Sequence, residues 1–159
     1  MTTTTTTTKT EFRLTAGGMA ALKAELQELT TNKRVEIAER LKEAKADGDL
    51  SENAMYDAAR EAQGFMEGRI SEIEHILKHS SLISNTGKSE VALGSTVHVA
   101  LAGSTQKYTI VGSTEANPDE GKISEESLVG KALLGKKAGD EVSVQVPSGT
   151  LTYTIHKVE

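Results

Sequence analysis

The residues of this sequence that could do chemistry are acids, and four of them stand close together. Between residues 46 and 57 the chain carries Asp47, Asp49, Glu52 and Asp57, with no lysine or arginine among them. Carboxylates repel one another by about 1 kcal/mol per pair at 4 Å in water, and by more where solvent is excluded. Mg²⁺ would relieve that repulsion, because it takes one or two protein carboxylates and completes its shell with water and phosphate oxygens. The segment is therefore a candidate Mg²⁺ site.

The same acids have a structural interpretation, which the pattern alone favours. Asp49 followed by Glu52 matches a capping box, in which Asp49 caps a helix and Glu52 reaches back to its backbone N–H. Acids are also stabilised by the positive end of the helix dipole. Asn caps as well as Asp, and Gln can serve in the box. Asp49→Asn and Glu52→Gln should therefore preserve the helix while each removes a charged ligand, which separates capping from metal binding.

Helical patterns on both sides must position the acidic segment. Thr15 can cap the first helix, Lys33 interrupts its apolar stripe, and Gly48 suits a turn that needs positive φ. Apolar residues recur at spacings of three and four in both helices, namely Met19, Leu22, Leu26, Leu29, Ile37, Leu41 and Ala44, then Ala59, Ala62, Met66, Ile70, Ile73 and Leu77. Two helices with a short connection run antiparallel and pack side by side. The sequence predicts a helical hairpin with the acids at its tip.

Gly64 and Gly68 lie inside the second helix, where each costs about 1 kcal/mol relative to Ala. Being four residues apart, they share a helix face. We expect another backbone to come close to that face. A membrane-dimer interpretation of this spacing fails, because Glu67 and Arg69 flank Gly68.

After residue 85 the apolar period becomes two, which predicts strands. They are expected around Val97–Leu101, Tyr108–Ile110, Val142–Val146 and Leu151–Ile155. A short helix is expected over 125–135, begun by Ser124 and closed by Gly135. The prediction is a disordered Thr-rich tail (1–11), a hairpin domain (12–82) and a small antiparallel sheet with one short helix (88–159), the boundary falling within 80–88. The fold class is α+β.

Composition narrows the functional classes. Only 36% of the 159 residues are hydrophobic and 3% aromatic, which suits a thin helical element better than one large core. The net charge of −5 disfavours strong binding to free nucleic acid, whose phosphates attract basic proteins. Without cysteine there are no disulfides or thiolate metal sites. No apolar run approaches the roughly 20 residues of a membrane helix, and no secretory signal is visible, so we expect a cytoplasmic protein without membrane contact.

Residues 48–70, GDLSENAMYDAAREAQGFMEGRI, resemble the signature of the Gre transcript-cleavage (transcription elongation) factors, closest to the GreA branch. The stretches GKIS (121–124), GKALLGK (130–136) and GD (139–140) resemble that family too, so that the likeness covers nearly everything from Phe12 onward. It implies an antiparallel coiled coil followed by an FKBP-like domain. Two positions depart from the family pattern: Met55 stands where an acid is expected, and Leu128 where proline is usual.

The resemblance also implies an activity. Such factors dock on bacterial RNA polymerase through the C-terminal domain and insert the coiled-coil tip into the secondary channel of a backtracked complex. The polymerase then cleaves the 3′ end of the nascent RNA, so that the factor is not itself an enzyme. It implies that Asp49 is a direct ligand, and Glu52 its partner, of a second Mg²⁺ shared with the polymerase, with no tightly bound cofactor. The protein is expected to be a monomer.

Further residues are candidates for contact with the polymerase complex. Leu50, Asn53, Tyr56 and Arg60 occupy other tip positions of the family pattern. Their structural interpretations are a turn anchor, helix-start hydrogen bonding, packing across the hairpin and an ion pair with Asp57, respectively. A basic group could steer the extruded RNA, although a charge run is more often a solvated face: Lys33, Arg34, Arg40, Lys42 and Lys45.

Three other functions compete with transcript cleavage. A Gre-like protein could occupy the channel and inhibit the polymerase. An FKBP-type domain could be a prolyl isomerase, but such pockets need aromatic walls and the C-terminal half offers only Tyr108 and Tyr153. A free-standing nuclease is disfavoured, because two solvated acids at a rod tip cannot hold two metal ions or exclude water.

Overall fold

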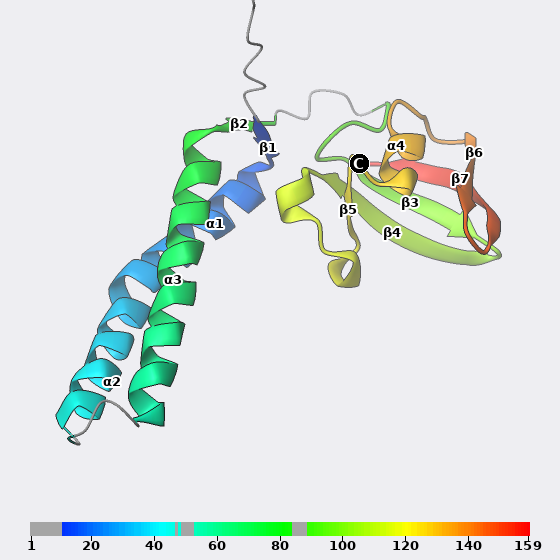
Figure 1. The fold of residues 1–159 in the computed structure, drawn as a ribbon. Coiled ribbons are helices and arrows are strands. Elements are labelled where there is room, and N and C mark those ends of the chain that lie inside the picture. Colours follow the sequence, from blue (N-terminus) through cyan, green and yellow to red (C-terminus); the bar gives the residue numbers. More distant parts are fainter. Residues whose placement is uncertain (1–10, 47, 49–52, 84–88) are drawn as a thin grey trace, which may run out of the picture. The chain divides into compact units, whose positions relative to one another are not determined.

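The computed structural model describes residues 11–46, 48, 53–83 and 89–159. They form two compact units, residues 19–79 and residues 11–18 together with 80–159 (Figure 1). No helix in this described part of the chain is long and apolar enough to cross a membrane. The Thr-rich tail lies outside it except for Glu11, and the predicted domain boundaries stay predictions.

The first unit is the predicted helical hairpin. Its first arm contains α1 (Ala16–Glu28), the π-helix η1 (Leu29–Lys33) and α2 (Arg34–Ala46), and its second arm is α3 (Ala54–Lys78). Figure 1 shows α2 and α3 side by side. Apolar side chains of the two arms pack against one another between them. The core consists of Ile37, Met66 and Ile70, with partly buried Leu26, Leu29, Leu41 and Ala62 against it.

The π-helix η1 explains why Lys33 breaks the apolar stripe. The Thr30 hydroxyl donates to the carbonyl of Leu26 (2.7 Å), and the Thr31 hydroxyl to that of Gln27 (2.6 Å). Threonine hydroxyls that bond to the preceding turn compete with the regular helical ladder and often bend a helix. The wider π turn shifts the phase of the arm, so that Ile37 returns to the core face.

Two bidentate ion pairs join the arms on either side of this turn. Arg34 donates through Nε and Nη2 to the Glu67 carboxylate (2.8 and 2.7 Å), and Arg69 donates to both oxygens of Glu25 (2.7 and 2.9 Å). The Arg69 hydrogen bond lowers the pKa of Glu25, and the Arg34 hydrogen bond lowers that of Glu67. Planar two-bond pairs fix geometry as well as charge, so they set the register of the two arms.

The prediction for Gly64 and Gly68 is wrong. Both are exposed, and a Cβ built on either would meet nothing within 4 Å. Phe65, between them, is 74% exposed. Sequence spacing showed that the glycines share a face, but it could not show that this face points away from the other arm.

The second unit, residues 11–18 with 80–159, is called the C-terminal unit below. It contains the predicted strands β3 (Thr96–Leu101), β4 (Ser104–Val111), β6 (Glu141–Val146) and β7 (Gly149–Val158), with β5 (Lys122–Ser124) at one edge. The described strands make a five-stranded sheet in the order β5-β4-β3-β7-β6. The expected purely antiparallel sheet needs correction, because β5 pairs parallel with β4. The inward side chains of the alternating strands form the core, including Val97, Val99, Ile110, Tyr153 and Ile155.

The short helix begins later than predicted. It is α4 (Leu128–Leu133), and its N-cap is Ser127, whose hydroxyl accepts from the Gly130 amide at 3.0 Å. Ser124, the predicted start, ends β5 instead, and its carbonyl accepts from both the amide (3.1 Å) and the hydroxyl (2.7 Å) of Ser127. The residues in between form a turn, which places the cap three residues further along.

The N-terminal residues belong to the same unit as the sheet. β1 (Phe12–Leu14) pairs parallel with β2 (Ser80–Leu82), which the sequence did not predict. Thr15 caps α1 as predicted, its hydroxyl accepting from the Gly18 amide at 3.0 Å. The Glu115 carboxylate, at the end of the 3-10 turn η2 (Ser113–Glu115), in turn accepts from the Thr15 amide (2.7 Å) and hydroxyl (2.8 Å). A second 3-10 turn, η3 (Pro118–Glu120), precedes β5.

Candidate functional site: the hairpin tip

The two arms of the hairpin end at a connection that holds the predicted acidic site. α2 ends at Ala46, α3 begins at Ala54, and Gly48 has φ of 107°, the positive value expected for it. Most residues of the connection lie outside the described part of the chain, namely Asp47, Asp49, Leu50, Ser51 and Glu52. The structure therefore defines what supports the acids on either side.

Asn53 connects the two sides of the tip through one side chain. Its Oδ1 accepts from the amides of Met55 and Tyr56, both at 3.1 Å, which caps α3. Its Nδ2 donates to the carbonyl of Ala44 at 2.7 Å, near the end of α2. One amide group thus satisfies donors at the start of one helix and an acceptor at the end of the other. The bond joins the start of α3 to the last turn of α2.

The capping role predicted for Asp49 is consequently wrong for this helix. Asn53 has the extended backbone of an N-cap, with φ of −94° and ψ of 93°, and it makes the capping bonds itself. The structural interpretation of Asn53 as a helix-start residue is confirmed. Its bond to Ala44 was missed, because nothing in the local sequence indicates a contact across the hairpin. Asp49 and Glu52 themselves lie outside the described part of the chain.

The remaining tip candidates face solvent to different degrees. Arg60 is exposed and donates to Gln63 (3.1 Å) instead of pairing with Asp57, so that this structural interpretation is wrong. Tyr56 is half-buried. Met55, where the family pattern has an acid, is 67% exposed and borders a shallow hollow of about 420 Å³ with Arg40, Glu43, Ala58 and Ala59. All three side chains therefore keep exposed surface near the start of α3.

The basic candidates divide into two groups. Lys33 pairs with Glu36 (2.9 Å), Arg40 also pairs with Glu36, and Arg34 pairs with Glu67. Lys42 and Lys45 are exposed and make no ion pair within the described residues. Both lie in the part of α2 next to the tip. Of the five, these two lysines carry charge that no described carboxylate neutralises.

The described part of the chain holds no larger group of metal-ligating side chains. No three side chains of the His, Cys, Asp and Glu types come together there in a way that could hold a metal ion. The described acid of the tip, Asp57, is exposed. Asp47, Asp49 and Glu52 lie outside the described residues, so the Mg²⁺ site stays a prediction from the sequence.

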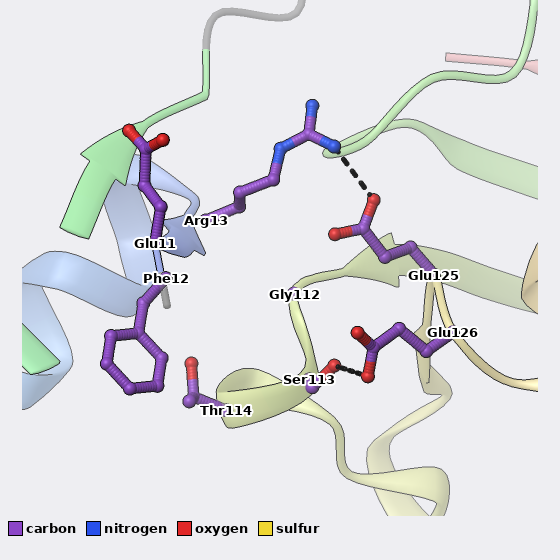
Figure 2. A pocket seen from close by; sticks show the side chains of 8 residues that line it. All are labelled: Glu11, Phe12, Arg13, Gly112, Ser113, Thr114, Glu125 and Glu126. Atoms are coloured by element: carbon purple, nitrogen blue, oxygen red, sulfur yellow. Dashed lines mark hydrogen bonds and ion pairs between the residues drawn. The ribbon is translucent and has the colours of Figure 1, made fainter. Parts of the chain in front are cut away.

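A small polar pocket lies in the C-terminal unit, and none of these candidates lines it (Figure 2). It has a volume of about 180 Å³, and Arg13 bonds to Glu125 across it at 3.1 Å, while Ser113 donates to Glu126 at 2.6 Å. Gly112 borders it, and a Cβ there would lie 2.0 Å from the carbonyl oxygen of Arg13. Arg13 bonds to Glu125 and Glu126 accepts from Ser113, so we interpret the pocket as a structural joint between β1 and the segment after β4.

An apolar hollow of about 340 Å³ lies at the other end of β5 and the start of α4. Leu128, the residue that replaces the usual proline, is 61% exposed at its edge, and Pro118, Ile123, Val129 and Val146 line it. No aromatic side chain borders it. Tyr108 and Tyr153 instead pack edge to face with ring centroids 6.4 Å apart in the core, where burial raises the pKa of Tyr108.

A helical hairpin whose arms are joined near the tip by Asn53, and a mixed sheet with one short helix, define a two-unit protein. A family model described as the N-terminal part of a transcription elongation factor matches residues 12–81, and one for the GreA/GreB C-terminal part matches residues 86–159. The chain belongs to the GreA/GreB family of transcription elongation factors.

Several relatives are similar over most of their length. Transcription elongation factor GreA of Macrococcus caseolyticus is 51% identical over 142 residues, covering 87% of this chain and 90% of that protein. GreA of Bacillus subtilis is 48% identical over 150 residues, covering 92% and 96%. Among solved structures, GreA factor homolog 1 of Thermus thermophilus is 28% identical, covers 94% of this chain and 99% of that one, and has a TM-score of 0.44.

Proposed function

We propose that this protein rescues backtracked RNA polymerase by inserting the hairpin tip into the secondary channel and stimulating the polymerase's own cleavage of the nascent RNA 3′ end. The observation that carries the proposal is the double role of Asn53. It caps α3 and bonds to α2, so that neither task requires the acids between the two helices. We therefore assign Asp49 and Glu52 to the partner's chemistry and not to the fold of the hairpin.

The chemistry proposed for the tip is that of two-metal hydrolysis. In such sites one ion favours the attacking oxygen and the other the leaving oxygen of an in-line displacement. Asp49 would contribute a direct carboxylate ligand to a Mg²⁺ shared with the polymerase, and Glu52 would act on the same ion or its bound water. The protein would not be an enzyme by itself, and it would need no tightly bound cofactor.

The described side chains suggest how the rest of the molecule contributes. Lys42 and Lys45 are the basic candidates best placed to steer extruded RNA, since Lys33, Arg34 and Arg40 are engaged by carboxylates. Leu50, Tyr56 and Arg60 would contact the channel. The C-terminal unit, which we take to be FKBP-like, would dock on the polymerase through the hollow beside Leu128. The protein would act as a monomer in the cytoplasm, where the polymerase works.

A cleavage assay on a stalled bacterial polymerase complex tests the function. The full-length protein with Mg²⁺ should shorten the labelled RNA from its 3′ end and restore elongation. Slowed synthesis without shortened RNA would show a channel-binding inhibitor instead. Cleavage of naked RNA without polymerase would show a nuclease and contradict the proposal.

No described feature favours a prolyl isomerase. Ligand pockets of that kind depend on apolar and aromatic walls. Tyr153 is 4% exposed and packs in the core, and the hollow beside Leu128 has no aromatic lining.

A further inference from the structure

The end of α3 carries two histidines that the proposed function does not use. His75 and His79 are one turn apart, so their side chains lie on the same helix face. Their ring centroids are 4.3 Å apart, and the rings are tilted by 46° rather than stacked flat. A zinc–imidazole bond is about 2.0–2.1 Å long, so one ion can reach a nitrogen of each ring with only small side-chain rotations.

A backbone contact fixes which nitrogen of His79 is available. The Nδ1 atom of His79 lies 2.9 Å from the carbonyl oxygen of His75. A carbonyl can only accept, so Nδ1 carries the proton of the neutral ring and Nε2 keeps its lone pair. Metal-bound histidines typically donate their second ring N–H to a carbonyl or carboxylate, which orients the ring and increases its basicity. His79 already has this arrangement.

The surroundings favour a cation of a particular class. His79 is the C-cap of a 25-residue helix, and the negative end of the helix dipole stabilises positive charge there. Glu72, one turn before His75, is bonded to Arg69 at 2.8 Å, and no third His, Cys, Asp or Glu joins the pair within the described residues. Water would therefore complete the shell. Two imidazoles select Zn²⁺, Cu²⁺ or Ni²⁺ over Mg²⁺, which prefers oxygen ligands.

We propose that His75 and His79 form a binding site for a divalent transition-metal ion, held by Nε2 of His79 and a ring nitrogen of His75. The site lies in the last turn of α3, and the ion would fasten that turn. It is separate in both place and ligand chemistry from the Mg²⁺ proposed for the tip.

Cu²⁺, which binds such ligands most tightly among these ions, is the probe. The tag-free full-length chain is mixed with equimolar Cu²⁺, and the electron paramagnetic resonance spectrum is expected to show coupling to two imidazole nitrogens. His75→Gln and His79→Gln should each raise the dissociation constant measured by calorimetry at least tenfold and abolish the two-nitrogen signal. Zn²⁺ should raise the melting temperature of the wild-type chain but not of either variant.

The other two histidines supply matched controls. His98→Gln and His156→Gln, both in the sheet unit, should leave Cu²⁺ affinity unchanged. Circular dichroism should show equal helix content in all four variants, which separates lost binding from lost folding. The proposal is overturned if the wild-type chain shows no two-nitrogen signal, or if affinity follows His98 or His156. No polymerase is present, so the result is independent of the proposed function.

Discussion

At the scale of single residues, Asn53 is the side chain on which the tip depends most. Asn53→Ala removes the cap of α3 and leaves the Ala44 carbonyl without its donor. Loss of an N-cap alone costs about 1 kcal/mol of stability. We expect Asn53→Ala to lower the free energy of unfolding by at least that amount, as measured by urea denaturation.

Asn53→Asp separates the two tasks, because Asp caps as well as Asn but cannot donate to Ala44. It should retain most of the stability while loosening the base of the tip, so transcript cleavage should fall more than stability does. If Asn53→Asp cleaved RNA as well as the wild type, the bond across the hairpin would have no part in positioning the acids.

Glu25 is a residue whose contribution should depend on pH. Its pKa is lowered from the ordinary value of 4.5 by the Arg69 hydrogen bond, so the folded state holds the carboxylate charged more strongly than the unfolded state does. The resulting stability is present above pH 4.5 and is lost as the pH falls through the lowered pKa. Glu25→Gln should therefore cost about 0.5 kcal/mol at pH 7, a typical value for a half-exposed pair, and progressively less in acid.

Thermal melts of wild type and Glu25→Gln from pH 7 downward measure this difference. Glu39→Gln is the control, because Glu39 is exposed and makes no ion pair within the described residues. A gap between wild type and Glu25→Gln that stayed constant into acid would show that the carboxylate charge is irrelevant to the pair.

At the scale of elements, alanine substitutions at two glycines should change the stability of the protein in opposite directions. A Cβ at Gly112 would lie 2.0 Å from the Arg13 carbonyl oxygen, a backbone atom that can move only if β1 moves. Gly112→Ala should therefore destabilise the C-terminal unit by about 1–3 kcal/mol, the usual cost of overpacking. Gly64→Ala meets open space on an exposed helix face and should stabilise the hairpin by up to about 1 kcal/mol.

Chemical denaturation followed by circular dichroism measures both glycine variants. An unchanged denaturation midpoint for Gly112→Ala would mean that the Arg13 backbone in β1 does not lie close to Gly112 in solution.

Elements whose cause is local were predictable from the sequence, and those that depend on a distant partner were not. The apolar stripes from Leu22 to Ala44 and from Ala59 to Leu77 predicted the hairpin. Apolar residues spaced three and four apart fall on one face of an α-helix, and two such faces can pack against each other. The caps show the limit of this reasoning. Asp49 and Ser124 fit the cap pattern, but the caps in the structure are Asn53 and Ser127.

Pairings between remote segments had no visible signal. β1 with β2, β5 parallel to β4, and the contact of Glu115 with Thr15 all join residues whose own stretches are too short to show a period. The π turn was partly visible in the sequence, because Thr30 and Thr31 are residues whose hydroxyls can bond to the preceding helical turn. At the tip, the sequence resemblance indicated the acids, while the bond from Asn53 to the Ala44 carbonyl became visible only in the structure.

At the scale of the whole molecule, the proposed docking on RNA polymerase through the hollow beside Leu128 can be tested by substitution. Leu128→Ser should weaken binding to RNA polymerase about tenfold, because it removes an exposed apolar contact of roughly one buried leucine side chain. Leu82→Ser is the matched control, since Leu82 is 54% exposed in the same unit but away from the hollow. Equal affinities of the two variants, measured by fluorescence anisotropy, would place the docking surface elsewhere.

The proposed division of labour, in which the chain supplies tip charge and the polymerase supplies the catalytic centre, depends most directly on Asp49. Transcript cleavage by a stalled polymerase should be compared for wild type and Asp49→Asn, with unfolding and polymerase binding measured in parallel. We expect Asp49→Asn to bind and fold like the wild type while losing at least a hundredfold in cleavage rate, about 2.7 kcal/mol of transition-state stabilisation. Full cleavage by Asp49→Asn would contradict the proposal.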